Sequence, residues 1–413
     1  MVKLHYLRGI LWNVFLYFIA SYPFIWAIGI AIIFWPVLLI LFRGELINCR
    51  QSFISNSLFL IGLIEIISIP IGILSFQVGL DRILSAIVNG LIWICTSFLV
   101  SYKFSDSDLI RLRKILIGIG ISQGVIVFIA RMTLPQVLPI PLLHNSMKIF
   151  GANSAAFSNN QVVYVDWLNG FTLRTHGIMA NATWAGGFSA VAIILLLSNQ
   201  SLSIGALARN AVKYSLLIFV VYLSLSRSVM IALLFSIASG LILKLSQNAN
   251  PQSQIAIVSL IAIFIVSAAV LIISGNYFNI FFESINQTRS GSLESRSDIY
   301  RITVELIREH PFPIIGYGVK PSGEGLVASI ATHSTPLGIL FKAGLLGLLI
   351  YVFFVIASFK KLISTRNWLG FSIMTFIFLW SLLEDFDGGH LIPIFLVLVF
   401  QPKLNKMLRD NLT

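Results

Sequence analysis

Long apolar stretches follow one another along almost the whole chain, and only short polar segments separate most of them. A helix of roughly 17–25 apolar residues crosses about 30 Å of hydrocarbon and satisfies its own backbone hydrogen bonds, as lipid requires. The pattern predicts about twelve such helices, near residues 7–21, 24–42, 54–75, 83–101, 115–133, 178–198, 211–225, 228–243, 254–274, 335–358, 367–384 and 391–401. Residues 10–42 alternatively fit one long tilted helix and a surface segment. The sequence thus predicts an all-α polytopic membrane protein in which residues 1–413 form a single integral membrane domain.

Composition excludes a soluble globular domain. Hydrophobic residues make up 57% of the chain and charged residues 11%, whereas soluble domains average about 45–50% and about 25%. The formal net charge is +12, but the basic residues are spread over many loops without interleaved aromatic residues. That spread is not typical of a nucleic-acid-binding surface. We therefore expect membrane lipids, and no nucleic acid, among the partners.

The distribution of Lys and Arg predicts how the chain is oriented in the membrane. Most of these residues fall at the two ends and in alternate loops, for example Lys103, Lys244 and Lys361. Short loops rich in Lys and Arg stay in the cytoplasm, so both termini are expected to be cytoplasmic. The two long loops, at 134–177 and 275–335, are then expected on the outer, periplasmic face.

The loop at 275–335 carries basic residues on the face where the orientation rule disfavours them. They are Arg289, Arg296, Arg301, Arg308 and Lys320, and His333 follows them. Apolar residues at 299, 302, 306 and 307 recur with the period of a helix that buries one face. This spacing predicts an amphipathic helix over 295–308, lying along the surface.

The end of this loop is expected to approach the next span closely. Gly316 and Gly318 predict a turn that brings the backbone near another element. Thr335 suits a helix cap and Pro336 suits the first helical turn. His333 is therefore expected at the mouth of the helix that begins near residue 335.

Short motifs occur in a fixed order along the chain. They are Arg174-Thr175-His176-Gly177-Ile178-Met179-Ala180-Asn181 before one span, Ser226-Arg227-Ser228 between two spans, and the series Arg296, Pro313, Gly316-Tyr317-Gly318, His333 and Gly344-Leu345-Leu346-Gly347. Over residues 165–350 this set resembles the O-antigen ligases and the related polysaccharide polymerases of bacterial inner membranes. The chain departs from the family at Ser334, where Asn is frequent, and at Lys342, where an acidic residue is common.

The resemblance implies a metal-independent, inverting glycosyltransferase of the inner membrane that needs no cofactor. Its donor would be a glycan on a polyprenyl (undecaprenyl) diphosphate, and its acceptor a sugar hydroxyl of a glycan or of a lipid A core, at the periplasmic face. A polymerase that joins one carrier-linked repeat unit to another is the alternative within the family. A transporter for the same lipid-linked sugar is the alternative from another class, but the large outer loop with its helix and histidine favours an enzyme.

Three residues are the candidates for catalysis. Arg174 and Arg227 would stabilise the diphosphate leaving group, because guanidinium groups bind phosphate oxygens bidentately and stay charged at the membrane boundary. His333 would act as the general base that takes the proton from the acceptor hydroxyl. Alternatively, Arg174 only binds lipid headgroups and His333 only caps a helix.

Four further residues are expected to bind substrate: Arg296, Arg301, Tyr317 and Lys342. Arg296 either binds phosphate or holds the loop helix in place. The acidic turn at 384–390 contains two Asp residues with the spacing of metal-dependent sugar transferases. We nevertheless expect no metal there, because a short turn between two spans gathers polar capping residues in any case.

Overall fold

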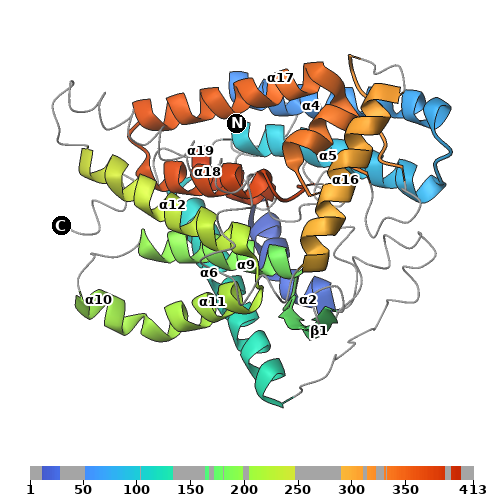
Figure 1. Cartoon of the computed structure of the whole chain (residues 1–413). Helices are drawn as coiled ribbons and strands as arrows, with labels where there is room; N and C mark the ends of the chain where they lie inside the picture. Colours follow the sequence, from blue (N-terminus) through green and yellow to red (C-terminus); the bar gives the residue numbers. More distant parts are fainter. Residues whose placement is uncertain are drawn as a thin grey trace.

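The computed structural model describes residues 12–27, 52–102, 104–133, 163–166, 172–179, 181–198, 204–246, 290–309, 314–321, 330–331, 333–386 and 392–400. These residues are mainly helical (Figure 1). The helices are α2 (Tyr22–Ala27), α4 (Phe53–Ser75), α5 (Leu80–Ser101), α6 (Asp106–Thr133), α9 (Ala182–Leu197), α10 (Ile204–Arg209), α11 (Ala211–Leu223), α12 (Arg227–Leu245), α16 (Ser290–Glu309), α17 (Thr335–Ser364), α18 (Trp368–Ser381) and α19 (Ile392–Phe400). A hairpin of β1 (Val163–Asp166) and β2 (Thr172–Thr175) is the exception to the predicted all-α class.

Membrane-spanning length is found in five of the described helices. α4, α5, α6, α12 and α17 are long and apolar enough to cross a bilayer, and α9, α11 and α18 are shorter apolar helices. All of them coincide with predicted spans, which supports the prediction of a polytopic membrane protein. The predicted span at 254–274 and most of that at 24–42 lie outside the described residues. The total of about twelve spans therefore stays a prediction.

The centre of the bundle is formed by α9, α18 and α19. All nine residues of α19 are buried, and so is nearly all of α9. Helices that are apolar on every side belong inside a bundle, where neighbouring helices cover them. Trp380 of α18 lies against the backbone of α9 at Gly187, where any added Cβ atom would collide with the indole ring. Because Gly187 has no side chain, α9 and α18 approach closely at Trp380, which also packs against Trp184 and Phe386.

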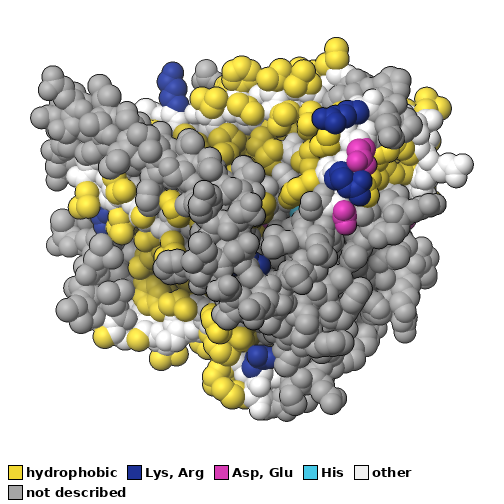
Figure 2. Space-filling view, viewed as in Figure 1, with side chains coloured by type: hydrophobic (Ala, Val, Ile, Leu, Met, Phe, Trp, Pro, Cys, Tyr) yellow, Lys and Arg dark blue, Asp and Glu magenta, His cyan; other side chains and the backbone are white. Residues whose placement is uncertain are grey.

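The outer surface of α17 is apolar and exposed. Leu345, Leu349, Val352 and Ile356 recur at intervals of three or four residues, and they are exposed together with Phe353. Figure 2 shows hydrophobic side chains over this edge of the molecule, where Figure 1 places α17 beside α4. Lipid is the solvent that suits such a stripe, because an exposed apolar face of this length is costly in water.

The start of α6 lies beside the end of α9. The buried guanidinium of Arg113 donates to the carbonyl oxygen of Leu195 from both Nε, at 3.2 Å, and Nη2, at 2.6 Å. Carbonyls in the last turn of a helix lack intrahelical partners, and a cation is favourable there. α6 and α9 are therefore antiparallel. This arrangement agrees with the predicted orientation, in which the start of α6 and the end of α9 both face the cytoplasm.

A reporter domain fused after Lys361 is expected to read as cytoplasmic, and one inserted near Ser322 as external, because the positive-inside rule places them so. The control is a variant without Cys49 and Cys95 that carries Thr365→Cys at the exposed end of α17. An impermeant maleimide should label that cysteine only after the cells are lysed. Labelling in intact cells would overturn the predicted orientation.

The hairpin lies inside the segment predicted as the outer loop at 134–177. Its antiparallel strands place Tyr164 opposite Arg174 and Val163 opposite Thr175. Both strands are rich in the β-branched residues that favour extended structure, whereas the prediction for the whole segment was loop. The strand β2 ends directly before the turn that leads into α9, so it carries Arg174 to the end of the bundle where α9 begins.

Candidate functional site at one end of the bundle

A break in α17 shapes this end of the molecule. Gly344 has φ of 68° and ψ of −168°, which interrupts the helix after its first turns. The segment Gly316-Tyr317-Gly318 supplies the hydrogen bonds that the break leaves unmade. Tyr317 N donates to the carbonyl of Phe341 at 2.9 Å, and Gly318 N donates to that of Lys342 at 2.8 Å. The span predicted as one helix at 335–358 therefore consists of two helical pieces, and the Gly316–Gly318 segment packs against the break between them.

The same glycines allow this segment to lie against α4. A Cβ atom at Gly318 would collide with the backbone at Ser68 and Ile69, and one at Gly72 would collide with the carbonyl of Tyr317. Ser68 Oγ donates to the carbonyl of Ile315 at 2.6 Å. Gly316 and Gly318 also adopt φ of 78° and 72°, which other residues rarely adopt. The predicted close approach of this segment to another element is thus confirmed. The segment packs between α4 and the break in α17.

Two of the predicted substrate-binding residues lie inside this packing. Tyr317 is buried, with its ring centroid 5.0 Å from that of Phe76 and 5.1 Å from that of Phe341. Burial raises the pKa of its phenol. The Lys342 ammonium lies 2.9 Å from a carboxylate oxygen of Glu65, and both side chains are at most 2% exposed. Glu65 was not among the predicted site residues, although a single carboxylate within an apolar span is itself a signal of a partner.

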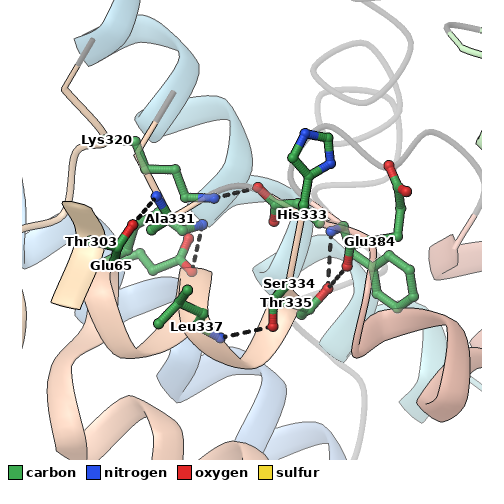
Figure 3. Close-up of polar contacts among 12 residues, drawn as sticks. Glu65, Thr303, Lys320, Ala331, His333, Ser334, Thr335, Leu337 and Glu384 are labelled. Atoms are coloured by element: carbon green, nitrogen blue, oxygen red, sulfur yellow. Dashed lines mark hydrogen bonds and ion pairs between the residues drawn. The ribbon is translucent and has the colours of Figure 1, made fainter. Parts of the chain in front are cut away.

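His333 lies directly before α17, as predicted from Thr335 and Pro336. Ser334 is the N-cap residue, and its Oγ accepts a hydrogen bond from Leu337 N at 3.4 Å. The His333 side chain is partly buried, and its backbone oxygen accepts a hydrogen bond from the Tyr300 hydroxyl at 2.7 Å. Figure 3 shows the imidazole projecting away from the start of the helix, on the side to which the Glu384 side chain also extends.

The acidic turn after α18 binds this helix start. Thr335 donates to the carbonyl of Glu384 from its backbone N, at 3.1 Å, and from Oγ1, at 2.8 Å. Asp385 forms an ion pair with Lys320, and both side chains are largely buried (Figure 3). Glu384 and Asp385 thus stabilise the N-terminal end of α17. The sequence predicted only that polar residues of this turn would cap a helix. The rest of the turn, which contains its second aspartate, Asp387, and a possible metal ligand, His390, lies outside the described residues.

Arg227 is the first residue of α12 and is partly buried. The preceding turn contains Leu225 with φ of 50°. Thr175, the residue after Arg174, donates from Oγ1 to the carbonyl of Leu223 at 3.0 Å. This bond joins the end of β2 to the turn before Arg227. The two arginine segments predicted to bind diphosphate are therefore adjacent, although they are far apart in sequence.

An aromatic layer connects the Arg227 turn with the start of α17. The turn approaches α9 at Gly186, where an added Cβ would meet Ser224. Trp184, at the start of α9, has its ring 4.8 Å from Trp380 and 5.9 Å from Phe386. Phe386 N in turn donates to Thr335 Oγ1 at 3.1 Å. The predicted anion-binding and base residues thus occur at the same end of the bundle.

The predicted loop helix is present as α16, which begins earlier than residue 295. Arg296 lies one helical turn before Tyr300. Arg301 is exposed and forms ion pairs with Glu305 at 3.1 Å and Asp298 at 3.5 Å. Its hydrogen bonds to Glu305 and its attraction to that carboxylate raise its pKa. Figure 2 shows these charges gathered on the outer surface.

The helices and this polar cluster define an integral membrane protein with charged and hydrogen-bonding groups collected at one end of an apolar bundle. Residues 214–352 match the family model described as O-antigen ligase, Wzy_C. The match confirms the resemblance predicted from the motifs over this segment, which includes Ser226-Arg227-Ser228 and the series from Arg296 to Gly347 but not the motif at Arg174. The matched segment contains Arg227, Tyr300, Tyr317, His333 and Lys342. A search of curated proteins found no match.

Proposed function

We propose that this protein is a membrane glycosyltransferase that moves a glycan from a polyprenyl diphosphate carrier to a sugar hydroxyl on the periplasmic face of the bacterial inner membrane. The observation that carries the proposal is the arrangement of His333 and Arg227 at the same end of the bundle, inside the segment that matches the O-antigen ligase family. The reaction proceeds with inversion and without a metal or other cofactor. Its acceptor is a glycan or the lipid A core, as in a ligase.

The donor is bound through its diphosphate. Negative charge develops on that leaving group as the glycosidic bond breaks, and fixed cations stabilise such charge most effectively where water is scarce. Arg227 begins a helix, so the backbone N–H groups of its first turn add to the same positive field. Arg174 comes from the adjacent strand, joined to this turn through Thr175 and Leu223. Together they form the anion site of the proposal.

The acceptor hydroxyl is activated by His333. A sugar hydroxyl is a poor nucleophile until its proton is withdrawn, and a neutral imidazole withdraws it at physiological pH. The proton passes to His333, the hydroxyl oxygen attacks the anomeric carbon, and the diphosphate departs from the opposite side. Arg296 and Arg301 on α16 contact anionic groups of the glycan or of lipid headgroups. Tyr317 and Lys342 are buried in the packing against α4, so they shape the substrate site by supporting its α4 side.

The glycans that accumulate in a strain lacking the gene test the proposed reaction. The ligase reaction predicts that complete polymer collects on the lipid carrier, with none attached to its final acceptor. Accumulation of single carrier-linked repeat units would instead assign the protein as a polymerase of the family. Accumulation of those units on the inner leaflet would overturn the enzyme proposal in favour of a transporter. Purified protein should also retain transfer in EDTA.

Arg227→Ala is expected to lower glycan transfer by about 100- to 1,000-fold, because removal of one fixed donor from an oxyanion site has effects of that order. Arg227→Lys should recover only part of the rate, since an ammonium does not bind two phosphate oxygens in parallel. The measurements are initial rate and donor binding in proteoliposomes. Arg209→Ala, at the exposed end of α10, is the control and should match wild type. Wild-type rates in Arg227→Ala would remove this residue from the diphosphate site.

A further inference from the structure

The backbone around His333 adopts a conformation that L-residues rarely adopt. Ala331 has φ of 56° and His333 has φ of 65°, and neither residue is glycine. Left-handed conformations at such residues persist only where surrounding contacts hold them, and they gather at functional sites. The direction in which the imidazole leaves the backbone is set by this turn. Whatever stabilises the turn therefore also places the imidazole.

Two hydroxyl groups of α16 contact this turn. Tyr300 Oη donates to the carbonyl of His333 at 2.7 Å. Thr303 Oγ1 accepts a hydrogen bond from Ala331 N at 2.9 Å and donates to the carbonyl of Ile299 at 2.6 Å. The two residues are three apart and therefore occupy the same face of the helix. The Tyr300 hydroxyl thus contacts one residue with positive φ, His333, and the Thr303 hydroxyl contacts the other, Ala331.

The helix that presents these hydroxyls is itself fixed. Ile299 and Thr303 are fully buried, and Ile302, Leu306 and Ile307 pack on a cluster that includes Tyr317, Ile330 and Phe341. That cluster is continuous with the glycine segment seated in the break of α17. From the other side, Thr335 is bonded to the turn at Glu384. His333 lies between Ala331, which is bonded to α16, and Thr335, which is bonded to Glu384 (Figure 3).

We propose that Tyr300 and Thr303 are positioning residues, which act on glycan transfer by holding the His333 backbone so that the imidazole meets the acceptor hydroxyl. The inference rests on the proposed role of His333 as the base. Proton transfer demands close alignment of donor and acceptor, and a misplacement of about 1 Å can lower a rate on the order of 100-fold. The two residues contribute to turnover through geometry, while donor binding at the arginines is independent of them.

The test removes each hydroxyl with little change in shape. Tyr300→Phe and Thr303→Val should each lower kcat by about 10- to 100-fold, with the KM for the lipid-linked donor within about twofold of wild type. Thr303→Ser keeps a hydroxyl and should recover most of the rate. Tyr222→Phe, at an exposed position of α11, is the matched control. Thermal unfolding in detergent, measured for every variant, separates loss of folded protein from loss of rate.

A double-mutant cycle identifies the group through which the hydroxyls act. In a His333→Ala background, Tyr300→Phe and Thr303→Val should cause no further loss, because the group they position is gone. An equal further loss in that background would overturn the inference and leave the proposed base intact. So would wild-type kcat in both single variants while His333→Ala is impaired. Full activity of His333→Ala itself would overturn the proposed function instead.

Discussion

Replacing His333 with alanine is expected to lower the rate of glycan transfer by about 100- to 10,000-fold, because that is the usual contribution of a positioned general base. Donor binding should change little, since proton withdrawal matters in the transition state and hardly at all in the ground state. Single-turnover transfer in proteoliposomes, together with equilibrium binding of the lipid-linked donor, measures both quantities. His333→Asn keeps a polar side chain of helix-capping type but cannot take the proton, so it should be no better than alanine.

The pH dependence of the rate provides the second measurement on His333. A base must be unprotonated to act, so the wild-type rate should fall as pH drops through the range in which imidazole titrates. This acidic limb should be absent from the residual rate of His333→Ala. An unchanged limb, or a loss explained entirely by lower protein abundance, would show that His333 serves only to shape the turn before α17, whose N-cap is Ser334.

Lys342→Met is expected to lower the free energy of unfolding by about 3–5 kcal/mol, because it leaves the Glu65 carboxylate buried without its cation. Glu65→Gln should be destabilising in the same direction, for the converse reason. The double variant Glu65→Leu/Lys342→Met should recover most of the loss, since apolar groups can replace a buried pair at little net cost. Lys360→Met, exposed near the other end of α17, is the control. Unfolding by denaturant in detergent micelles provides the measurement.

The same variant also tests the expectation that Lys342 binds substrate. The ion pair with Glu65 occupies the ammonium in this structure, so the stability effect should dominate. Suppose instead that Lys342→Met unfolds like wild type but binds acceptor or donor poorly. The lysine would then act on substrate, as the sequence predicted, and its bond to Glu65 would be secondary.

The helices were largely predictable because their signal is local. Apolar runs predicted α4 to within one residue at its start, and the spacing of Ile299, Ile302, Leu306 and Ile307 predicted α16. His333 was placed at a helix mouth from Thr335 and Pro336, both of which follow general rules for helix starts. In each case the residues that determine the structure are neighbours in the sequence.

The contacts that build the site were not predictable, because their partners are distant in sequence. In the sequence, Glu65 is a single charged residue in an apolar span. Its partner Lys342 is evident only once α17 is packed against α4. Gly344 lies within a run that has helical composition, and only the seated glycine segment makes a break there favourable. Tyr300 and Thr303 look like ordinary members of an amphipathic helix. Their partners are backbone atoms, which leave no pattern in the sequence.

The break at Gly344 makes the shape of α17 depend on a segment that lies outside the helix. The carbonyls of Phe341 and Lys342 receive hydrogen bonds from Tyr317 and Gly318, and Leu346 N donates to Ile314. In hydrocarbon, backbone groups left without such partners would cost several kcal/mol each. The broken form of α17 therefore depends on the docked segment that precedes it, and the two form one cooperative unit of this end of the molecule.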